Sequence, residues 1–215
     1  MAVKEGVIKY TIQHTPAAPM AATELSELNA WRKILVLLKL IGQDPARYAG
    51  YGFGNISRRV APWDAAPEER HFVITGTQTG DIADLQPEDF TVVVASQSQK
   101  NTIVSEGPAY PSSESLTHGI IYDMDDSVRW VMHAHSPEIW RHAQALGIPV
   151  TDATVAYGSP EMANEVVRLF AETDVASQHI FAMGGHEDGI VTFGQTAEEA
   201  GSVMLFALAN AMARN

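Results

Sequence analysis

The sequence predicts a single α/β domain, because helical and extended patterns alternate along the chain and no linker separates them. Hydrophobic residues make up 46% of the 215 residues and charged residues 19%, which is typical of a folded chain rather than a disordered one. A chain of this length can bury one sizeable core. We expect an irregular leader over residues 1–22 and the domain over residues 23–215.

The first predicted helix has Thr23 as its N-cap and runs to about Ile41, where Gly42 and Pro45 end it. Its apolar side chains recur with the 3.6-residue period of a helix and form one stripe, which is expected to face the core. The stripe consists of Leu25, Leu28, Trp31, Ile34, Leu35, Leu38 and Ile41.

Extended segments dominate the next part of the chain, where Pro, Gly and Asp separate short β-favouring runs. We predict strands over residues 55–60, 71–75, 91–95 and 102–105. A helix is then expected from about Ser113, a strand over 128–134 and a helix over 137–146.

The last third continues this alternation. Pro160 favours the first position of a helix and opens one here. Segments 180–183 and 189–193 have the composition of strands. Thr196 and Glu199 have the spacing of a capping box and begin the closing helix.

Charge and composition disfavour several classes of protein. The formal net charge is −12, which is unfavourable for binding nucleic acid or an anionic membrane, since both are bound through clustered cations. No segment has the roughly 20 apolar residues of a membrane span or the apolar core of a signal peptide. We therefore expect a cytoplasmic protein. The absence of Cys excludes disulfides, thiolate nucleophiles and Cys-ligated metals.

The strongest local sign of chemistry is the pair His133 and His135 near the end of a predicted strand. Side chains two residues apart on a strand point to the same face, so the two imidazoles can converge on one point. A pair held in this way is half of a zinc site. Two unrelated polar histidines at a strand end fit the pattern equally well.

A second sign is the segment PSSE, residues 111–114, at the start of a predicted helix. Taken alone it is best explained as an ordinary cap, because Ser satisfies free amides and an acidic residue suits the first turn. The same groups also suit chemistry: amides and hydroxyls at a helix start bind an anion, and Glu114 can act as a ligand or a base beside a metal.

Three Gly-containing segments complete the set of candidates. The turn GGHEDG, residues 184–189, either supplies a third imidazole from His186 or is a simple hairpin turn. The segments GFGNISR, residues 52–58, and ITGTQTG, residues 74–80, each join a strand to a loop with small polar side chains. Such loops can hold a phosphate or carboxylate through backbone N–H groups, although most are only turns.

Taken together and in this order, these segments resemble the class II aldolase/adducin family. The matching runs are GNISR, ITGTQTG, PSSESLTHGIIY, VMHAHS and GGHEDGIVTFG, and the resemblance covers residues 23–213. It implies a three-layer αβα fold with a central, mainly antiparallel sheet and helices on both faces. It also implies a metal-dependent lyase of the aldolase type that acts on a small ketose or sugar phosphate as a homotetramer.

The resemblance also implies roles for particular residues. His133, His135 and His186 would bind one divalent metal, Zn²⁺ or alternatively Mn²⁺ or Co²⁺, and Glu114 would complete its sphere or serve as acid and base. The substrate phosphate would contact Asn55, Thr75, Gly76, Ser112 and Ser113. His118, one helical turn after Glu114, is expected either to support the site from behind or to be a buried structural histidine.

Other activities stay open at this point. The family also contains sugar-phosphate epimerases and dehydratases, and an adducin-like scaffold would share the fold without catalysis. A metal hydrolase would use the same ligands but would not need an anion-binding pair of serines. One departure from the sugar-phosphate aldolases concerns the short stretch 136–157, whose only Tyr, Tyr157, lies in VAYGSPE rather than at the place of the family's proton donor. The C-terminus also lacks their aromatic tail.

Overall fold

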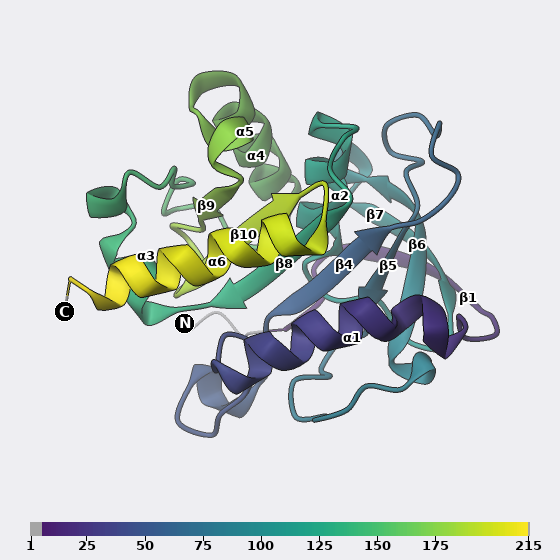
Figure 1. Cartoon of the computed structure of the whole chain (residues 1–215). Coiled ribbons are helices and arrows are strands. Elements are labelled where there is room, and N and C mark those ends of the chain that lie inside the picture. Colours follow the sequence, from purple (N-terminus) through teal and green to yellow (C-terminus); the bar gives the residue numbers. More distant parts are fainter. Residues whose placement is uncertain (1–5, 215) are drawn as a thin grey trace.

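One eight-stranded sheet runs through the computed structural model, which describes residues 6–214 (Figure 1). Its strands, in spatial order, are β1 (Thr11–Pro16), β7 (Thr102–Gly107), β6 (Phe90–Gln97), β5 (Phe72–Thr75), β4 (Asn55–Arg59), β8 (Trp130–His135), β10 (Gly189–Gly194) and β9 (Ile180–Ala182). Every neighbouring pair is antiparallel except β1 and β7. The expected mainly antiparallel sheet is confirmed. Two short strands, β2 (Gly42–Gln43) and β3 (Gly52–Phe53), form a separate pair.

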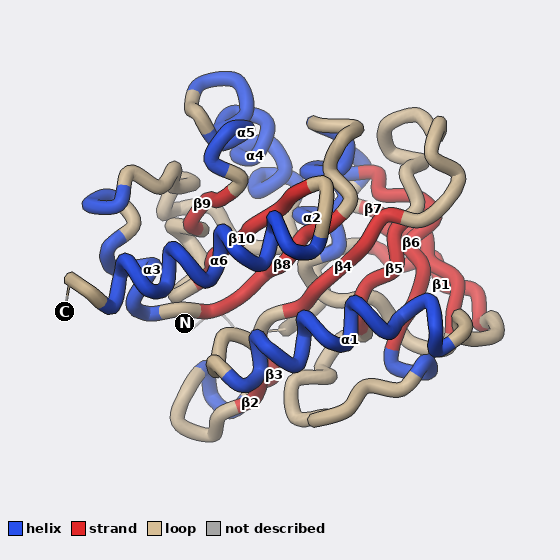
Figure 2. Tube along the Cα trace, viewed as in Figure 1, coloured by secondary structure: helices blue, strands red, loops and turns tan. Residues whose placement is uncertain are grey.

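Helices cover both faces of the sheet and complete the predicted three layers. On one face lie α1 (Ala22–Leu37), α3 (Pro137–His142) and α6 (Ala197–Met212), and α1 and α6 cross the near side of the sheet in Figure 2. On the other face lie α2 (Ser115–Met124), α4 (Pro160–Glu172) and α5 (Val175–Gln178). No helix in the described part of the chain is long and apolar enough to cross a membrane.

The two helical layers produce two separate hydrophobic clusters, because successive side chains of a strand point to opposite faces. On β8, Met132 packs into the cluster with Leu28 of α1, whereas Val131 packs into the cluster with Leu116 of α2. Each fully buried side chain of this size contributes about 1.5–3 kcal/mol. The central strands are therefore apolar on both faces, and polar side chains among them need a specific explanation.

The predicted irregular leader is wrong for Thr11–Pro16, which form β1 at the edge of the sheet. The strand pairs in parallel with β7, beginning with Thr11 opposite Thr102. An edge strand can be held by backbone hydrogen bonds alone, and most side chains of β1 are exposed, so it lacks the apolar alternation that marks a strand in the sequence. Residues 1–5 of the leader lie outside the described part of the chain.

Both ends of α1 differ from the prediction. Ala21 is the N-cap instead of Thr23, and the helix ends at Leu37 instead of continuing to Ile41. Lys39 adopts a left-handed conformation with φ of 58°, which turns the chain out of the helix. Ile41 still reaches the core, but from the loop that follows.

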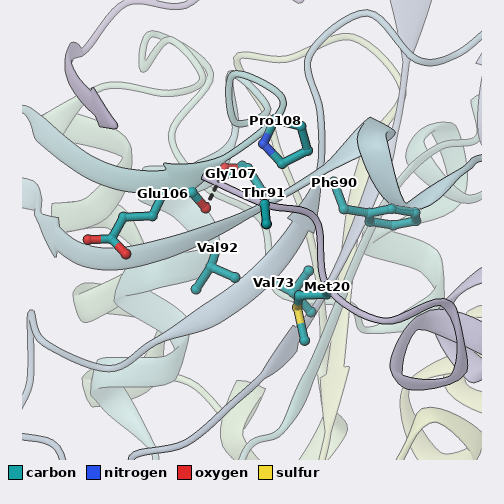
Figure 3. A pocket seen from close by; sticks show the side chains of 9 residues that line it. Met20, Val73, Phe90, Thr91, Val92, Glu106, Gly107 and Pro108 are labelled. Carbon is teal, nitrogen blue, oxygen red and sulfur yellow. Dashed lines mark hydrogen bonds between the residues drawn. The ribbon is translucent and has the colours of Figure 1, made fainter. Parts of the chain in front are cut away.

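The connection from β1 to α1 passes over β5 and β6 and leaves a small cavity there (Figure 3). Met20, Val73 and Phe90 line its apolar part, while the Thr91 hydroxyl donates a hydrogen bond of 3.2 Å to the backbone carbonyl of Glu106. None of the predicted site residues lines this cavity. It therefore belongs to the packing of the sheet.

Candidate metal centre

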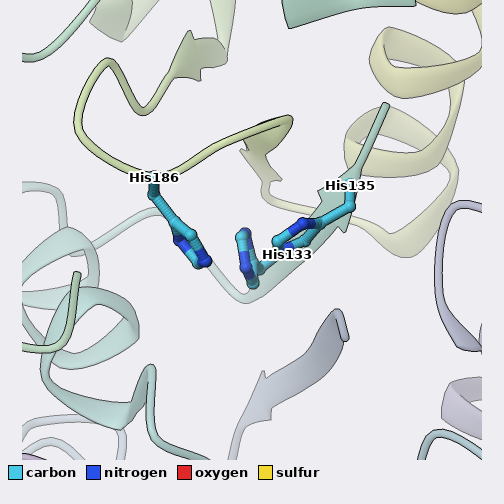
Figure 4. A group of neighbouring side chains, drawn as sticks. All are labelled: His133, His135 and His186. Carbon is cyan, nitrogen blue, oxygen red and sulfur yellow. The ribbon is translucent and has the colours of Figure 1, made fainter. Parts of the chain in front are cut away.

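Three imidazoles converge on one point, as Figure 4 shows. His133 and His135 come from β8 and His186 from the turn between β9 and β10. One ligand nitrogen from each lies within 4.8 Å of the other two, and all three side chains are buried. The ring centroids are 5.0 Å apart for His133–His135, 5.2 Å for His133–His186 and 4.7 Å for His135–His186. The structure thus brings together the histidines that the sequence singled out.

Strand pairing fixes this arrangement. β8 lies between β4 and β10, with His133 opposite Asn55 on one side and His135 opposite Gly189 on the other. The β9–β10 turn then brings His186 back over β8, held by hydrogen bonds from its N–H to Met183 and from Gly189 to its carbonyl. Gly185 is required in this turn, since a Cβ there would overlap the carbonyl oxygen of Val155.

Two of the imidazoles, His133 and His135, are held in the neutral form that binds metals. Burial, and then the neighbouring His186, lower the pKa values of His133 and His135 well below the usual value. The Nδ1 of His133 donates to the carbonyl of Ile190 at 3.2 Å, which leaves the lone pair on Nε2. That buried Nε2 has no hydrogen-bond partner among the described residues, although leaving a buried polar atom unsatisfied costs about 1–3 kcal/mol. A metal ion held by the three imidazoles would be such a partner.

Glu114 faces the imidazoles from the helical layer that contains α2. It occupies the N-cap position of α2 and is 1% exposed, yet its side chain does not cap the helix. One carboxylate oxygen accepts a hydrogen bond of 2.8 Å from Thr117, and the other lies 3.7 Å from Nδ1 of His186. Ser112 precedes the helix: its hydroxyl accepts a hydrogen bond of 3.4 Å from the N–H of Glu114, and its carbonyl accepts from the N–H of Ser115 at 3.0 Å.

A small polar pocket adjoins this centre, and most of the predicted phosphate contacts line it. Its walls include Asn55, Gly76, Ser112 and Ser113, together with Gly6, Gly52, Gly54 and residues 77–80. Backbone contacts of Gly76 with Pro111 and of Thr77 with Tyr110 bring the two loops together.

Thr75 is the exception among the predicted phosphate contacts. It is buried behind the pocket, and its hydroxyl accepts a hydrogen bond of 3.4 Å from the N–H of Ile56. The amides and hydroxyls that line the pocket therefore belong to Asn55, Ser112, Ser113 and loop 76–80, and not to Thr75.

His118 lies beside the metal centre but outside the three-histidine group. Its Nδ1 is 2.7 Å from the hydroxyl of Ser57, which is itself 2.7 Å from the hydroxyl of Tyr122. Burial lowers the pKa of His118 to about 3, so the ring stays neutral. This buried chain of hydrogen bonds favours the structural interpretation of His118.

Two aromatic contacts of the imidazoles, and a hydrogen bond behind one of them, were not predicted. The Tyr157 ring stacks on His186 with centroids 4.4 Å apart, and the Tyr48 ring meets His135 edge-on at 4.6 Å. The Tyr48 hydroxyl donates to Asp188 at 2.6 Å. Asp188 stands in the GGHEDG turn, so it could have been included from the sequence, but Tyr48 lies in an irregular loop with no recognisable pattern.

The N-terminal segment also reaches the site, which the sequence analysis did not expect. The N–H of Val7 donates to the Tyr157 hydroxyl at 3.2 Å, and the Tyr10 hydroxyl donates to the carbonyl of Ser112 at 2.6 Å. Gly6 lines the polar pocket and accepts a hydrogen bond from Gln78 at 3.3 Å. Part of the predicted leader is thus a wall of the candidate site.

Comparisons with known proteins agree with this fold. Residues 44–212 match the family model of the class II aldolase and adducin N-terminal domain. The structure is similar to an L-fuculose 1-phosphate aldolase, with a TM-score of 0.64, 20% identity, and coverage of 91% of this chain and 88% of that chain. It is also similar to the L-fuculose-1-phosphate aldolase of Thermus thermophilus, with a TM-score of 0.64, 19% identity, and 90% and 93% coverage.

A sugar-phosphate aldolase from Thermotoga maritima gives a TM-score of 0.62 at 15% identity, with 89% of this chain and 93% of that chain covered. No curated protein sequence matches the chain. At such identities a structural likeness establishes the fold, whereas the family model spans most of the sequence and includes all three histidines. The chain therefore belongs to the class II aldolase and adducin family.

Proposed function

We propose that the protein is a metal-dependent lyase of the aldolase type, which cleaves or forms a carbon–carbon bond in a small ketose or sugar phosphate. The observation that carries the proposal is the buried convergence of His133, His135 and His186 opposite Glu114. A non-catalytic scaffold gains nothing from such a group, because buried polar atoms destabilise a fold unless they are satisfied.

The donor set fits a divalent cation, with Zn²⁺ favoured and Mn²⁺ or Co²⁺ as alternatives. Zinc–nitrogen bonds of about 2.0–2.1 Å place the nitrogens of a tetrahedral site about 3.3 Å apart. The three ligand nitrogens lie within 4.8 Å of one another, so modest side-chain movements would bring them to that spacing. Three protein ligands leave a position for substrate, as catalytic sites require. When bound, the cation supplies a Lewis acid that stabilises the negative charge developing on substrate oxygens.

Glu114 is the proposed acid and base. Its carboxylate is buried, and the hydrogen bond from Thr117 orients one oxygen so that the other faces the imidazoles. A carboxylate held in this way can take a proton from the substrate and return it to the carbon left by bond cleavage. Because Glu114 begins α2, the helix fixes its position relative to β8.

The polar pocket is proposed to hold the substrate's anionic group. Ser112 and Ser113 stand just before α2, where free amides favour an anion, and loop 76–80 lies opposite them. The net charge of −12 repels anionic substrates at long range, so local donors of this kind have to bind the phosphate. This pocket favours a phosphorylated substrate.

The first test is metal content, measured by elemental analysis of the purified protein beside the variants His133→Ala and His71→Ala. We expect about one divalent ion per chain in the wild type and in His71→Ala, because His71 lies outside the three-histidine group. We expect none in His133→Ala. A protein that takes up no ion even after supplementation would overturn the lyase proposal and favour an adducin-like scaffold.

Product analysis then separates the reactions of the family. An aldolase releases an aldehyde and a smaller ketone from L-fuculose 1-phosphate or a related ketose phosphate, whereas an epimerase returns a stereoisomer and a dehydratase releases water. Unphosphorylated analogues test the role of the polar pocket. Each alternative keeps the same metal ligands, so the products and not the metal decide among them.

We further propose a cytoplasmic homo-oligomer, with the tetramer that the family resemblance implies. Light scattering after size-exclusion chromatography measures the mass directly. A monomer at micromolar concentration would contradict this part of the proposal and leave the metal centre unaffected.

A further inference from the structure

Three polar side chains lie behind two of the imidazoles and form one hydrogen-bonded cluster. The Tyr48 hydroxyl donates to Oδ2 of Asp188 at 2.6 Å and accepts from Nη2 of Arg47 at 2.7 Å. Burial, and then the hydrogen bond with Asp188, raise the pKa of Tyr48, so its hydroxyl remains a donor. The same Nη2 donates to the backbone carbonyl of His135 at 3.3 Å.

This cluster connects the two chain segments that carry His135 and His186. The Tyr48 ring lies edge-on to His135, with centroids 4.6 Å apart and planes inclined at 67°. Asp188 follows His186 by two residues in the same turn, and its carbonyl accepts a hydrogen bond of 2.8 Å from the N–H of Ser136. The ring orientation at one ligand and the turn at the other are thus linked through a single tyrosine.

The backbone beneath Tyr48 is strained. Tyr48 has φ of 49° and Ala49 has φ of 56°, so two consecutive residues with side chains are left-handed. Each such residue costs about 1–2 kcal/mol, and the conformation persists only where surrounding contacts hold it. The Ala49 side chain is exposed and does not explain the conformation, whereas Tyr48 reaches Asp188 and His135 because of it.

We propose that Arg47, Tyr48 and Asp188 are positioning residues of the metal centre, which hold the His135 ring and the His186 turn in the orientation that a divalent cation requires. The inference depends on the proposed metal-binding function. It goes beyond that function by assigning a role to three residues that are not metal ligands. Supporting hydrogen bonds of this kind typically change metal affinity by about 10- to 100-fold when they are removed.

The test uses the full-length protein loaded with Co²⁺, whose visible absorption reports ligand geometry. Tyr48→Phe removes the hydroxyl and keeps the ring against His135. We expect the bound ion to be lost to a chelator about 10- to 100-fold faster and the cobalt spectrum to change. A residue that only stabilised the fold would lower the melting temperature and leave the spectrum unchanged.

Ala49→Gly is the matched control, because it lies in the same turn, is exposed and removes strain without touching the cluster. It should leave the spectrum and the rate of metal loss unchanged. An equal effect in Ala49→Gly would attribute the loss to the rigidity of the turn and overturn the positioning role. Asp188→Asn weakens the acceptor and should shift both readouts in the same direction, so it serves if Tyr48→Phe does not fold.

The outcomes separate this inference from the proposed function. A wild-type protein that binds no divalent cation refutes both. A wild-type protein that binds Co²⁺, with Tyr48→Phe and Asp188→Asn equal to it in spectrum and rate of metal loss, refutes only the positioning role. Faster loss with an altered spectrum in these two variants, and not in Ala49→Gly, supports it.

Discussion

Strand β8 and the turn at residues 47–50 both reach the candidate metal centre, but different forces hold them. β8 is paired on both sides, and the alternation of side chains along the strand places His133 and His135 on one face. The turn has left-handed residues and lies outside the sheet, so local backbone hydrogen bonds and the contacts of Tyr48 with Asp188 and His135 hold it. The comparison teaches that strand geometry places His133 and His135, whereas a few contacts that one substitution can remove place Tyr48.

The largest expected effect concerns Glu114, which a regular element, α2, holds opposite β8. Glu114→Gln should lower turnover about 10²- to 10⁴-fold, because it removes the proposed acid and base. The metal should stay bound, since three imidazoles remain. Steady-state kinetics and metal content check the two statements. Unchanged turnover on a confirmed substrate would show that another group transfers the proton.

A smaller loss is expected from Thr117→Val, which leaves the Glu114 carboxylate in place but removes the 2.8 Å hydrogen bond that orients it. We expect a reduction in kcat of about tenfold with KM little changed, because only an interaction that aligns the carboxylate is lost. A larger loss than in Glu114→Gln would mean that Thr117 has a role of its own.

The rigidity of β8 can be tested from its opposite face. Met132 is fully buried and packs away from the imidazoles, so Met132→Ala should lower the free energy of unfolding by about 2–5 kcal/mol. Urea unfolding measures this difference. Leu37→Ala is the control, because Leu37 is 81% exposed and should change stability by less than about 0.5 kcal/mol. Equal effects would contradict the central role of this face of the strand.

In the turn at residues 47–50, Ala49→Gly should stabilise the protein by up to about 1 kcal/mol. Relief of the left-handed strain, about 1–2 kcal/mol, exceeds the roughly 0.4–1 kcal/mol that glycine adds to the entropy of the unfolded chain. The melting temperature should therefore rise by about 2–4 °C. A fall would mean that the backbone at Ala49 is not strained.

The smallest expected effect concerns Asp123 at the far end of α2, which contrasts with the buried Glu114 at its start. Burial raises the pKa of Asp123 to about 6, above the value of 3.8 expected in the unfolded chain. The folded state therefore binds the proton more tightly, and the stability present below about pH 4 is lost as the pH rises through about 6. Asp123→Asn carries no charge, so its melting temperature should gain on the wild type as the pH rises from about 4 to about 6. A constant difference across that range would contradict the raised pKa.

The sequence predicted the features that follow from the period of a strand or helix. It missed the features that depend on contacts between distant parts of the chain. The spacing of His133 and His135 defines one face of a strand, and the PSSE segment predicts the start of a helix at Glu114, although only the family resemblance gave Glu114 a role in the site. Neither β1 nor Tyr48 has a comparable signal, because an edge strand needs only backbone pairing and a strained turn follows no periodicity. The end of α1 was missed for a related reason: the apolar period continues past Leu37, although the chain turns away.

Neighbouring side chains on β8 point to opposite faces of the sheet, and this restricts where residues can be inserted into or deleted from the chain. Deleting or inserting one residue within the strand would exchange its two faces, so that the positions opposite Asn55 and Gly189 would present apolar side chains where imidazoles now stand. The histidines would then point into the apolar cluster around Met132. β8 can therefore vary in composition but not in residue count, and gains or losses of residues are confined to the loops around the sheet.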